Sequence, residues 1–129
     1  LKEDVKNRDL EENVTFLGFM KDVSGLLYHS DIFVFPSLWE GTASSIVEAM
    51  AFCKPVICFD VSSMPEMVEH EKTGLLTPFK DSKKFAENIE KILEHPEKQK
   101  EYGQAGFEKA RKFFSTDVVY KDWMEFLTS

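Results

Sequence analysis

Two short, uninterrupted apolar runs constrain the fold of this chain more than any other feature. They span residues 32–35 and 55–59, and the first run ends directly at Pro36. Runs of this length with β-branched members are typical of strands buried on both faces of a parallel sheet. Segments with helical apolar spacing lie between and after the runs. The alternation predicts an α/β fold with a parallel sheet, completed by C-terminal helices.

Further elements follow from periodicity and capping signals. Strands are predicted over residues 14–17 and 74–76, and helices over residues 21–29, 44–52, 63–70, from 81 onward, 96–114 and from 115 onward. The residues 63–66 form a capping box with proline early in the helix, and Asp81 is placed to cap the helix that follows it.

Composition limits the class of protein. The chain has 129 residues, 43% hydrophobic and 30% charged, with a net charge of −7. It is expected to form one domain over residues 1–129. No basic stripe is present, so a nucleic-acid partner is not expected. No apolar run is long enough to span a membrane, and a cytoplasmic protein is expected. Peripheral attachment to the inner membrane face stays open for a longer protein.

Cysteine and histidine residues carry no metal-ligand spacing, and no metal site is predicted. The two cysteines, Cys53 and Cys58, are expected to be buried, reduced thiols. The three histidines, His29, His70 and His95, each stand near a predicted helix end. They are interpreted as surface residues or as partners of helix C-termini.

The segment after the first apolar run is the candidate binding site. Ligands of open parallel sheets bind beyond the carboxyl ends of the strands. Residues 36–43 occupy that position, are rich in small side chains and lead into a helix. A helix N-terminus offers unpaired N–H groups to an anion such as phosphate. Ser44 or Ser45 is placed to cap this helix or to donate to a phosphate, although many such loops bind nothing.

Two carboxylates accompany this segment. Glu48 stands among apolar residues of the helix, where an ionised group needs partners. The hydroxyl groups of a ribose would supply them, as in dinucleotide sites. The alternative is that Glu48 lies on a solvated face together with Ser44 and Ser45. Glu40, just before Gly41, is placed to reach a sugar hydroxyl or the loop amides, or it is an ordinary exposed loop acid.

Together these residues resemble a known signature. The stretch at 36–51, PSLWEGTASSIVEAMA, is similar to the E-x7-E signature of retaining glycosyltransferases of family 4. Four further blocks resemble the same family in the same order: NVTFLG at 13–18, KPVI at 54–57, MPEMVE at 64–69 and TGLL at 73–76. A lone E-x7-E would be a weak signal, but five ordered blocks over roughly residues 13–79 are specific.

The resemblance implies a GT-B enzyme with two Rossmann-like domains, of which this chain matches the C-terminal, donor-binding one. It implies that Glu48 accepts hydrogen bonds from the ribose of a nucleoside-diphosphate sugar. It also implies that Glu40 is the catalytic residue and contacts the transferred sugar. Backbone amides of Gly41, Thr42, Ala43, Ser44 and Ser45 would face the sugar and diphosphate. Transfer with retention, without a metal or other cofactor, is the implied reaction.

Several positions depart from the family pattern. Thr42 and Ala43 stand where Phe-Gly is common. Cys53 and the pair Ser62-Ser63 stand at positions that are usually glycine. The acceptor domain, the first strands of the donor domain and the basic pair that neutralises the diphosphate have no counterpart here. Lys54 and Lys21 do not match that pair. The isolated chain is therefore expected to be inactive without its missing N-terminal domain.

Missing strands would leave sheet edges exposed. We expect the strands at 14–17 and 32–35 to pair directly, or chains to self-associate through an edge. Two alternatives to a transferase stay open: a non-catalytic nucleotide-binding or assembly module of the same fold, and another α/β enzyme such as a nucleotide-sugar epimerase.

Overall fold

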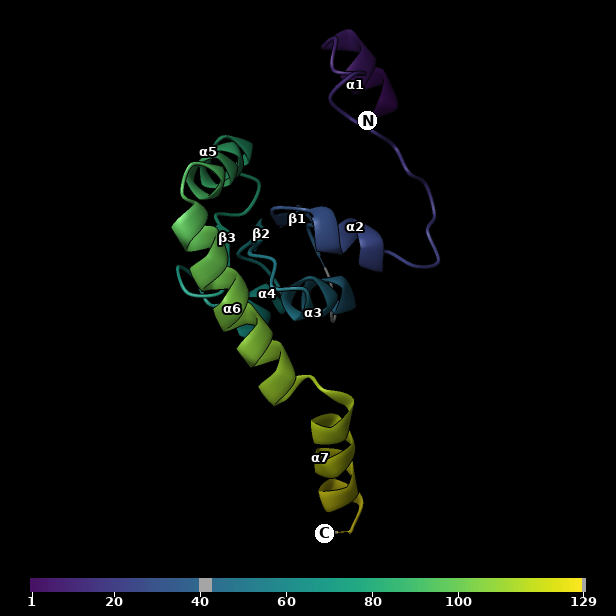
Figure 1. The fold of residues 1–129 in the computed structure, drawn as a ribbon, viewed down its shortest axis with the longest axis vertical. Helices are drawn as coiled ribbons and strands as arrows, with labels where there is room; N and C mark the ends of the chain where they lie inside the picture. The colour runs from purple at the N-terminus through teal and green to yellow at the C-terminus, as the bar shows by residue number, and fades with distance from the viewer. Residues whose placement is uncertain (40–42, 129) are drawn as a thin grey trace.

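The computed structural model describes residues 1–39 and 43–128. Its elements are α1 (Lys2–Asn7), α2 (Ser24–His29), β1 (Phe33–Phe35), α3 (Ser44–Ala51), β2 (Val56–Phe59), α4 (Met64–Met67), β3 (Gly74–Thr77), α5 (Ser82–Leu93), α6 (Pro96–Phe113) and α7 (Thr116–Thr128). Figure 1 shows this order along the chain, with the two termini at opposite ends of the molecule.

The three strands form one parallel sheet in the order β1-β2-β3. Phe33 pairs with Val56, and Val56 pairs in turn with Gly74. All strands therefore point the same way, and their carboxyl ends meet at one edge of the sheet. The α/β prediction and the strands predicted at the two apolar runs and at residues 74–76 are confirmed.

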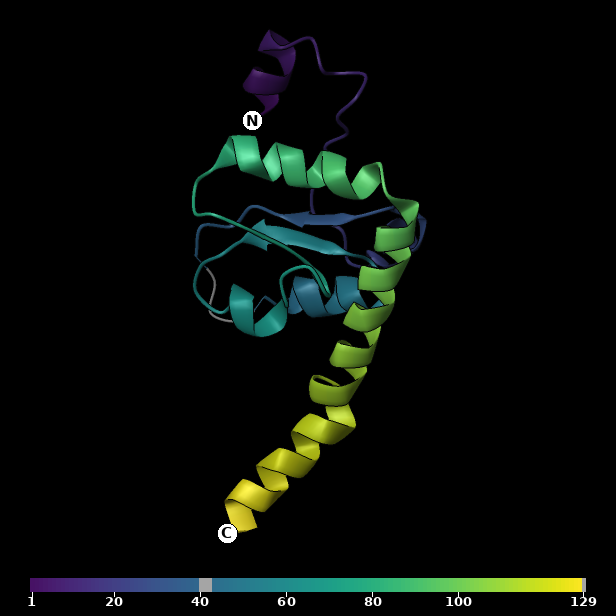
Figure 2. The ribbon, with the colours of Figure 1, turned by 90° about the vertical axis from the view of Figure 1, so that its left-hand side faces the viewer.

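Helices cover both faces of the sheet. Figure 2 shows α5 on one face and α3 with α4 on the other, while α6 runs past the sheet and contacts both layers. Side chains of β2 alternate between the layers. Val56 and Cys58 pack with the α3 and α4 side chains, whereas Ile57 and Phe59 pack with those of α5 and with Tyr102. The strand β2 is thus buried on both faces, as its continuous apolar run predicts.

For residues 32–35, the predicted strand is present, but the predicted burial on both faces is wrong. The side chain of Val34 is 41% exposed, and Phe33 and Phe35 are only partly buried. The reason is topological: β1 is an edge strand that pairs with β2 alone among the described residues.

The strand predicted at residues 14–17 is absent from the described structure. These residues form an irregular segment without regular secondary structure, and Phe16 and Leu17 are about half exposed. The expected direct pairing of this segment with β1 therefore does not occur. An apolar run becomes a strand only when a neighbouring strand accepts its backbone hydrogen bonds. Among the described residues no strand stands beside this segment.

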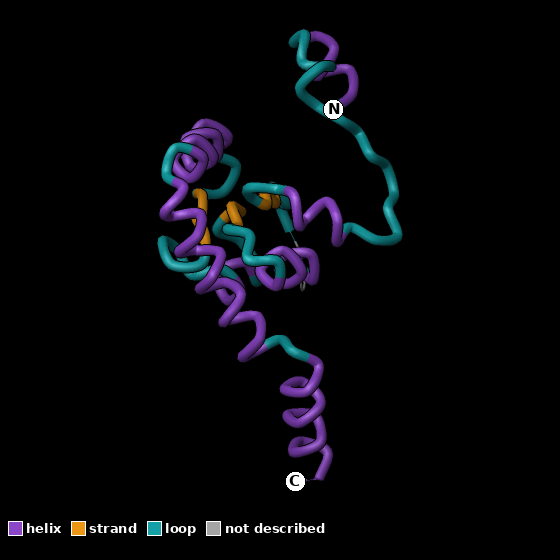
Figure 3. The backbone as a smooth tube through the Cα atoms, in the orientation of Figure 1, coloured by secondary structure: helices purple, strands orange, loops and turns teal. Residues whose placement is uncertain are grey.

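The helices predicted from residue 21 onward are present in the predicted order, but α1 is not among the predicted helices. The helix predicted over residues 63–70 is shorter, Met64–Met67, and the predicted capping box is not formed, because the side chain of Ser63 makes no capping hydrogen bond. Asp81 caps α5, because its carboxylate accepts a hydrogen bond from the backbone N–H of Lys84 at 2.9 Å. The last helix, α7, projects away from the sheet and buries none of its residues (Figure 3). Within the described residues, no helix combines the length and the apolar character needed to cross a membrane.

Candidate functional site

The carboxyl edge of the sheet carries the candidate site, as predicted. There, β1 ends at Phe35, and residues 36–43 lead from it into α3. Glu40, Gly41 and Thr42 lie outside the described residues, so their predicted roles stay predictions. On the strand side of that gap the side chain of Trp39 is 81% exposed. The hydroxyl of Ser37 donates a hydrogen bond to the carbonyl of Trp39 at 3.2 Å.

The N-terminus of α3 opens this edge without a side-chain cap. Ala43 is the N-cap residue, is buried to 3% exposure and offers no capping hydrogen bond. Ser44 and Ser45 lie inside the first turn, exposed and half-buried respectively. The expectation that one of these serines caps the helix is therefore wrong. The carbonyl of Ala43 accepts the N–H of Ile46 at 2.9 Å, which begins the helical hydrogen bonding. At the start of any α-helix the first N–H groups lack helical partners, and in the described structure those of Ser44 and Ser45 are the ones in this position.

Glu48 lies one turn further along α3, about 6 Å along the axis from Ser44 at the helical rise. Its side chain is exposed, whereas Ile46 and Ala49 beside it point into the core with no exposed surface. The interpretation of Glu48 as a carboxylate in apolar surroundings is wrong, because the helical period turns those neighbours to the other side. Glu48 shares the solvated face with Ser44. In the described structure its carboxylate forms no ion pair or hydrogen bond, so it is free to accept ligand hydroxyls.

Two residues at glycine positions of the family pattern adopt the left-handed backbone that glycine favours. Cys53, just after α3, has φ of 55°, and Ser62, after β2, has φ of 52°. Glycine reaches this region without strain, whereas a residue with a Cβ does not. The backbone therefore keeps the shape that the family pattern indicates although the side chains differ. Ser62 and Ser63 lead from the end of β2 into α4.

Lys54 lies at the opposite end of the sheet from the candidate site. Its ammonium group donates to the carbonyl of Tyr28 in the last turn of α2, over 3.0 Å. Cations at a helix C-terminus satisfy carbonyls that lack helical partners. This position agrees with the sequence-based exclusion of Lys54 as a diphosphate ligand.

The cysteines divide into two environments. Cys58 in β2 is fully buried, and burial, with a smaller contribution from Asp60, raises the pKa of its thiol to about 12. Cys53 is exposed, so the expectation of two buried thiols is wrong for it. Both thiols are unpaired. The two thiols differ in exposure because the side chain of Cys58 points from β2 into the core beneath α3 and α4. Cys53 lies in the left-handed turn after α3.

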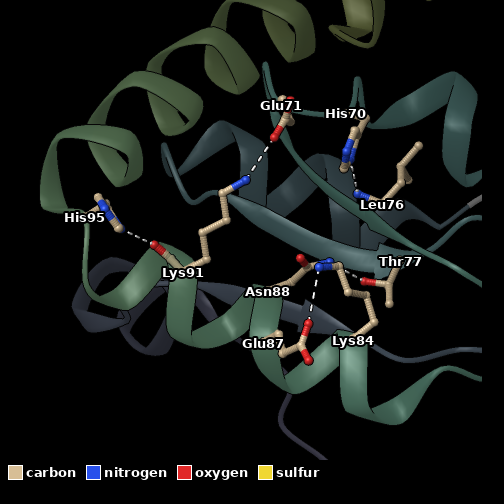
Figure 4. Close-up of polar contacts among 9 residues, drawn as sticks. All are labelled: His70, Glu71, Leu76, Thr77, Lys84, Glu87, Asn88, Lys91 and His95. Carbon is tan, nitrogen blue, oxygen red and sulfur yellow. Dashed lines mark hydrogen bonds and ion pairs between the residues drawn. The ribbon is translucent and has the colours of Figure 1, made fainter.

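A separate polar cavity of about 430 Å³ lies between α5 and the chain entering β3. Its lysines are already paired: Lys91 with Glu71 at 2.8 Å, and Lys84 with Glu87 at 3.2 Å (Figure 4). These neutralised cations do not favour an added phosphate. At its wall, the amide of Asn88 donates to the hydroxyl of Thr77 over 2.9 Å, and both residues are buried. Within the described residues, this cavity therefore offers an anion no lysine without an acidic partner.

The histidines take two different roles. His29 and His95 each hydrogen-bond through Nδ1 to a carbonyl four residues earlier, in the last turns of α2 and α5. These two confirm the expected contact with helix C-termini. His70 differs, because its Nδ1 accepts the backbone N–H of Leu76 in β3 at 3.0 Å (Figure 4). This hydrogen bond joins His70 to a strand and not to a helix C-terminus. For His70, only the expected position at the surface is confirmed.

A parallel sheet covered by helices on both faces, with a helix that begins at the carboxyl edge of the sheet, defines a Rossmann-like α/β domain. The chain belongs to a family within this class, the glycosyl transferases of group 1, whose model matches residues 1–109. It corresponds to the C-terminal domain of such a protein, with the GT-B fold.

Similar proteins support this assignment. The chain is 33% identical to the putative glycosyltransferase EpsD of Bacillus subtilis, over 83% of this chain and 28% of EpsD. It is 29% identical to the amylovoran biosynthesis glycosyltransferase AmsK of Erwinia amylovora, over 98% of this chain and 33% of AmsK. The structure of HepE from Anabaena in complex with UDP superposes with a TM-score of 0.94 at 28% identity, over 98% of this chain and 35% of HepE. HepE has also been solved with UDP-glucose. The chain thus spans about a third of the length of these relatives.

Proposed function

We propose that this chain is the donor-binding domain of a retaining glycosyltransferase and holds a nucleoside-diphosphate sugar at the N-terminus of α3. The observation that carries the proposal is the pairing of two complementary groups on one helix. The first turn of α3 lacks a side-chain cap, and Glu48 presents an exposed carboxylate without a partner one turn further on. Backbone N–H groups suit a diphosphate, and a carboxylate suits the two hydroxyls of a ribose.

The relatives support the choice of ligand. HepE, part of which has the same fold as this chain, has been solved in complex with UDP and with UDP-glucose. The assignments of Glu40 as catalytic residue and of Gly41, Thr42, Ala43, Ser44 and Ser45 as contacts to sugar and diphosphate are part of the proposal. The proposal includes no metal ion or other cofactor, and the nucleotide sugar counts as a substrate.

The setting of the reaction is also proposed. AmsK acts in amylovoran biosynthesis, and we propose that the full protein transfers its sugar in polysaccharide assembly. We further propose a cytoplasmic location, with which two free thiols are compatible. An N-terminal acceptor domain would complete the active site, and the single domain of residues 1–129 alone would bind a donor without turning it over.

Thermal unfolding with UDP, GDP, ADP and UDP-glucose in parallel tests the proposal. A nucleotide present at 100 times its dissociation constant stabilises the folded state by about 2.7 kcal/mol. We expect one base to stabilise the chain and Glu48→Ala to remove most of that effect. Glu101→Ala is the matched control, because Glu101 is exposed on α6 and its carboxylate forms no hydrogen bond or ion pair in the described structure.

Two outcomes would count against the proposal. Equal loss of the nucleotide effect in Glu48→Ala and Glu101→Ala would remove Glu48 from the site. No response of the wild-type chain to any of the nucleotides would leave the donor-binding role without support. Retention is tested in the full-length protein by the anomeric configuration of the product. Binding without any transfer by that protein would favour the non-catalytic module instead.

A further inference from the structure

The segment between β2 and α4 begins at the carboxyl edge of the sheet, where the segment after β1 also begins. It passes through the left-handed residue Ser62 and enters α4, a helix of only four residues. Figures 1 and 2 show α4 beside α3 on the same face of the sheet. A single helical turn is not stable by itself in water, so its place depends on tertiary contacts.

Apolar contacts hold one side of α4. Met64, Met67 and the following Val68 are buried to 3% exposure or less and join the cluster that includes α3 residues. Such contacts favour burial but are non-directional, and they fix the rotation of a short helix weakly. A directional contact is needed to fix the position of residues 60–63 at the carboxyl edge of the sheet.

Lys109 of α6 makes that directional contact. Its ammonium group donates to the carbonyl of Glu66, in α4, at 2.8 Å. It also lies 3.2 Å from a carboxylate oxygen of Glu69, just beyond the helix, and the Lys109 side chain is only 12% exposed. The other oxygen of Glu69 accepts from Lys72 at 2.7 Å. Hydrogen bonds from a charged donor are short and directional, so these two acceptors hold the Lys109 ammonium group in one position.

We propose that Lys109 is a positioning residue for the donor site. By joining α6 to both ends of the 66–69 segment, it fixes α4 and so holds the 60–63 segment in place beside α3. The inference rests on the proposed donor site and assigns Lys109 no contact with the ligand. The apolar side of α4 is independent of Lys109, so loss of the ammonium group loosens α4 without unfolding the sheet.

The test compares three substitutions in α6. Lys109→Met keeps the length and apolar stem but removes the charge, and Lys109→Arg restores a cation. Lys100→Met is the matched control on an exposed residue of the same helix. Amide hydrogen exchange is read over residues 64–69 and in β2, and the dissociation constant for UDP, or for whichever base the wild type binds, is measured in parallel.

We expect Lys109→Met to speed exchange over residues 64–69 by about tenfold or more, because a hydrogen bond to a charged group is lost. Exchange in β2 should stay unchanged, and nucleotide affinity should fall by about fivefold to tenfold. Lys109→Arg should recover part of both effects. Lys100→Met should show neither. Glu69→Gln should give a smaller loosening, because the bond to the Glu66 carbonyl remains.

Three outcomes would overturn the inference. One is unchanged exchange at residues 64–69 in Lys109→Met. Another is faster exchange there with an unaltered nucleotide dissociation constant. A third is a uniform change over all amides, β2 included, which would make Lys109 a residue of general stability. Failure of the wild type to bind any nucleotide is distinct, because it refutes the donor site itself.

Discussion

Gly103 of α6 lies against the backbone carbonyl of Cys53 so closely that a Cβ at position 103 would collide with the carbonyl oxygen. The contact joins α6 to the turn that ends α3. Because backbone atoms form the opposing surface, no side-chain rotation can relieve the collision. The closeness of these two residues makes the α3–α6 packing sensitive to a single methyl group.

Gly103→Ala should therefore destabilise the fold, by about 2–3 kcal/mol as in other overpacked sites. Gly106→Ala is the matched control on the same helix. Its Cβ would stand 3.4 Å from the flexible side chain of Met50, so the strain is small and the helix propensity of alanine offsets it. Urea denaturation of both variants measures the difference. Similar midpoints for the two would contradict the role of the Cys53 carbonyl.

Cys53→Gly should stabilise the chain. The left-handed φ of 55° strains a residue that carries a Cβ. Glycine relieves that strain, but it also has greater backbone entropy in the unfolded chain. The net gain in the free energy of unfolding should be about 0.5–1 kcal/mol. Cys53→Ala removes the thiol but keeps the Cβ and should leave the free energy of unfolding nearly unchanged. If Cys53→Ala raises the free energy of unfolding as much as Cys53→Gly does, the loss of the thiol and not the relief of strain is the cause.

The two thiols should differ in reactivity. At pH 8 an aromatic disulfide reagent should modify Cys53 rapidly, because this side chain is exposed. Cys58 should react only as the chain unfolds, because burial raises its pKa to about 12 and the thiolate is the reactive form. Absorbance of the released thiol should therefore show one fast equivalent, and a second one in denaturant. Two fast equivalents in the native chain would refute the buried environment of Cys58.

Acid should weaken the attachment of α4. Hydrogen bonds from Lys72 and, second, from Lys109 lower the pKa of Glu69 below its ordinary value of 4.5. A carboxylate with a lowered folded pKa contributes stability that is complete above 4.5 and is lost as the pH falls through the folded value. Glu69→Gln should therefore flatten the decline of stability below about pH 4.5. Denaturant midpoints from pH 7 to pH 3 measure this, with Glu101→Gln as the control that should follow the wild type.

Much of the fold could be predicted because local and tertiary signals agree. Residues 55–59 form an apolar run with β-branched members, and the strand they form is central, with a helical layer on each face. Asp81 caps its helix as its position indicates. Each of these predictions depends only on the residue and its near neighbours in the chain.

The remaining features depend on partners that are distant in sequence. Residues 14–17 have a strand-like pattern, but a strand also needs a neighbour, and none of the described strands lies beside them. Lys109 reaches a carbonyl 43 positions away, and nothing in its own segment marks it. At the site, the helical period that sends Ile46 inward also sends Glu48 outward, so apolar neighbours in sequence are not neighbours in space.

The imidazole of His70 has a consequence for how this sheet can grow. It accepts a hydrogen bond from the backbone N–H of Leu76 on the outer side of β3. Beside it, the carbonyl of Gly74 accepts a hydrogen bond from the backbone N–H of Glu71. An incoming strand would find those groups taken. Among the described strands, the edge left open to an additional strand, whether from the same polypeptide or from a second copy, is that of β1 at Phe33, Val34 and Phe35.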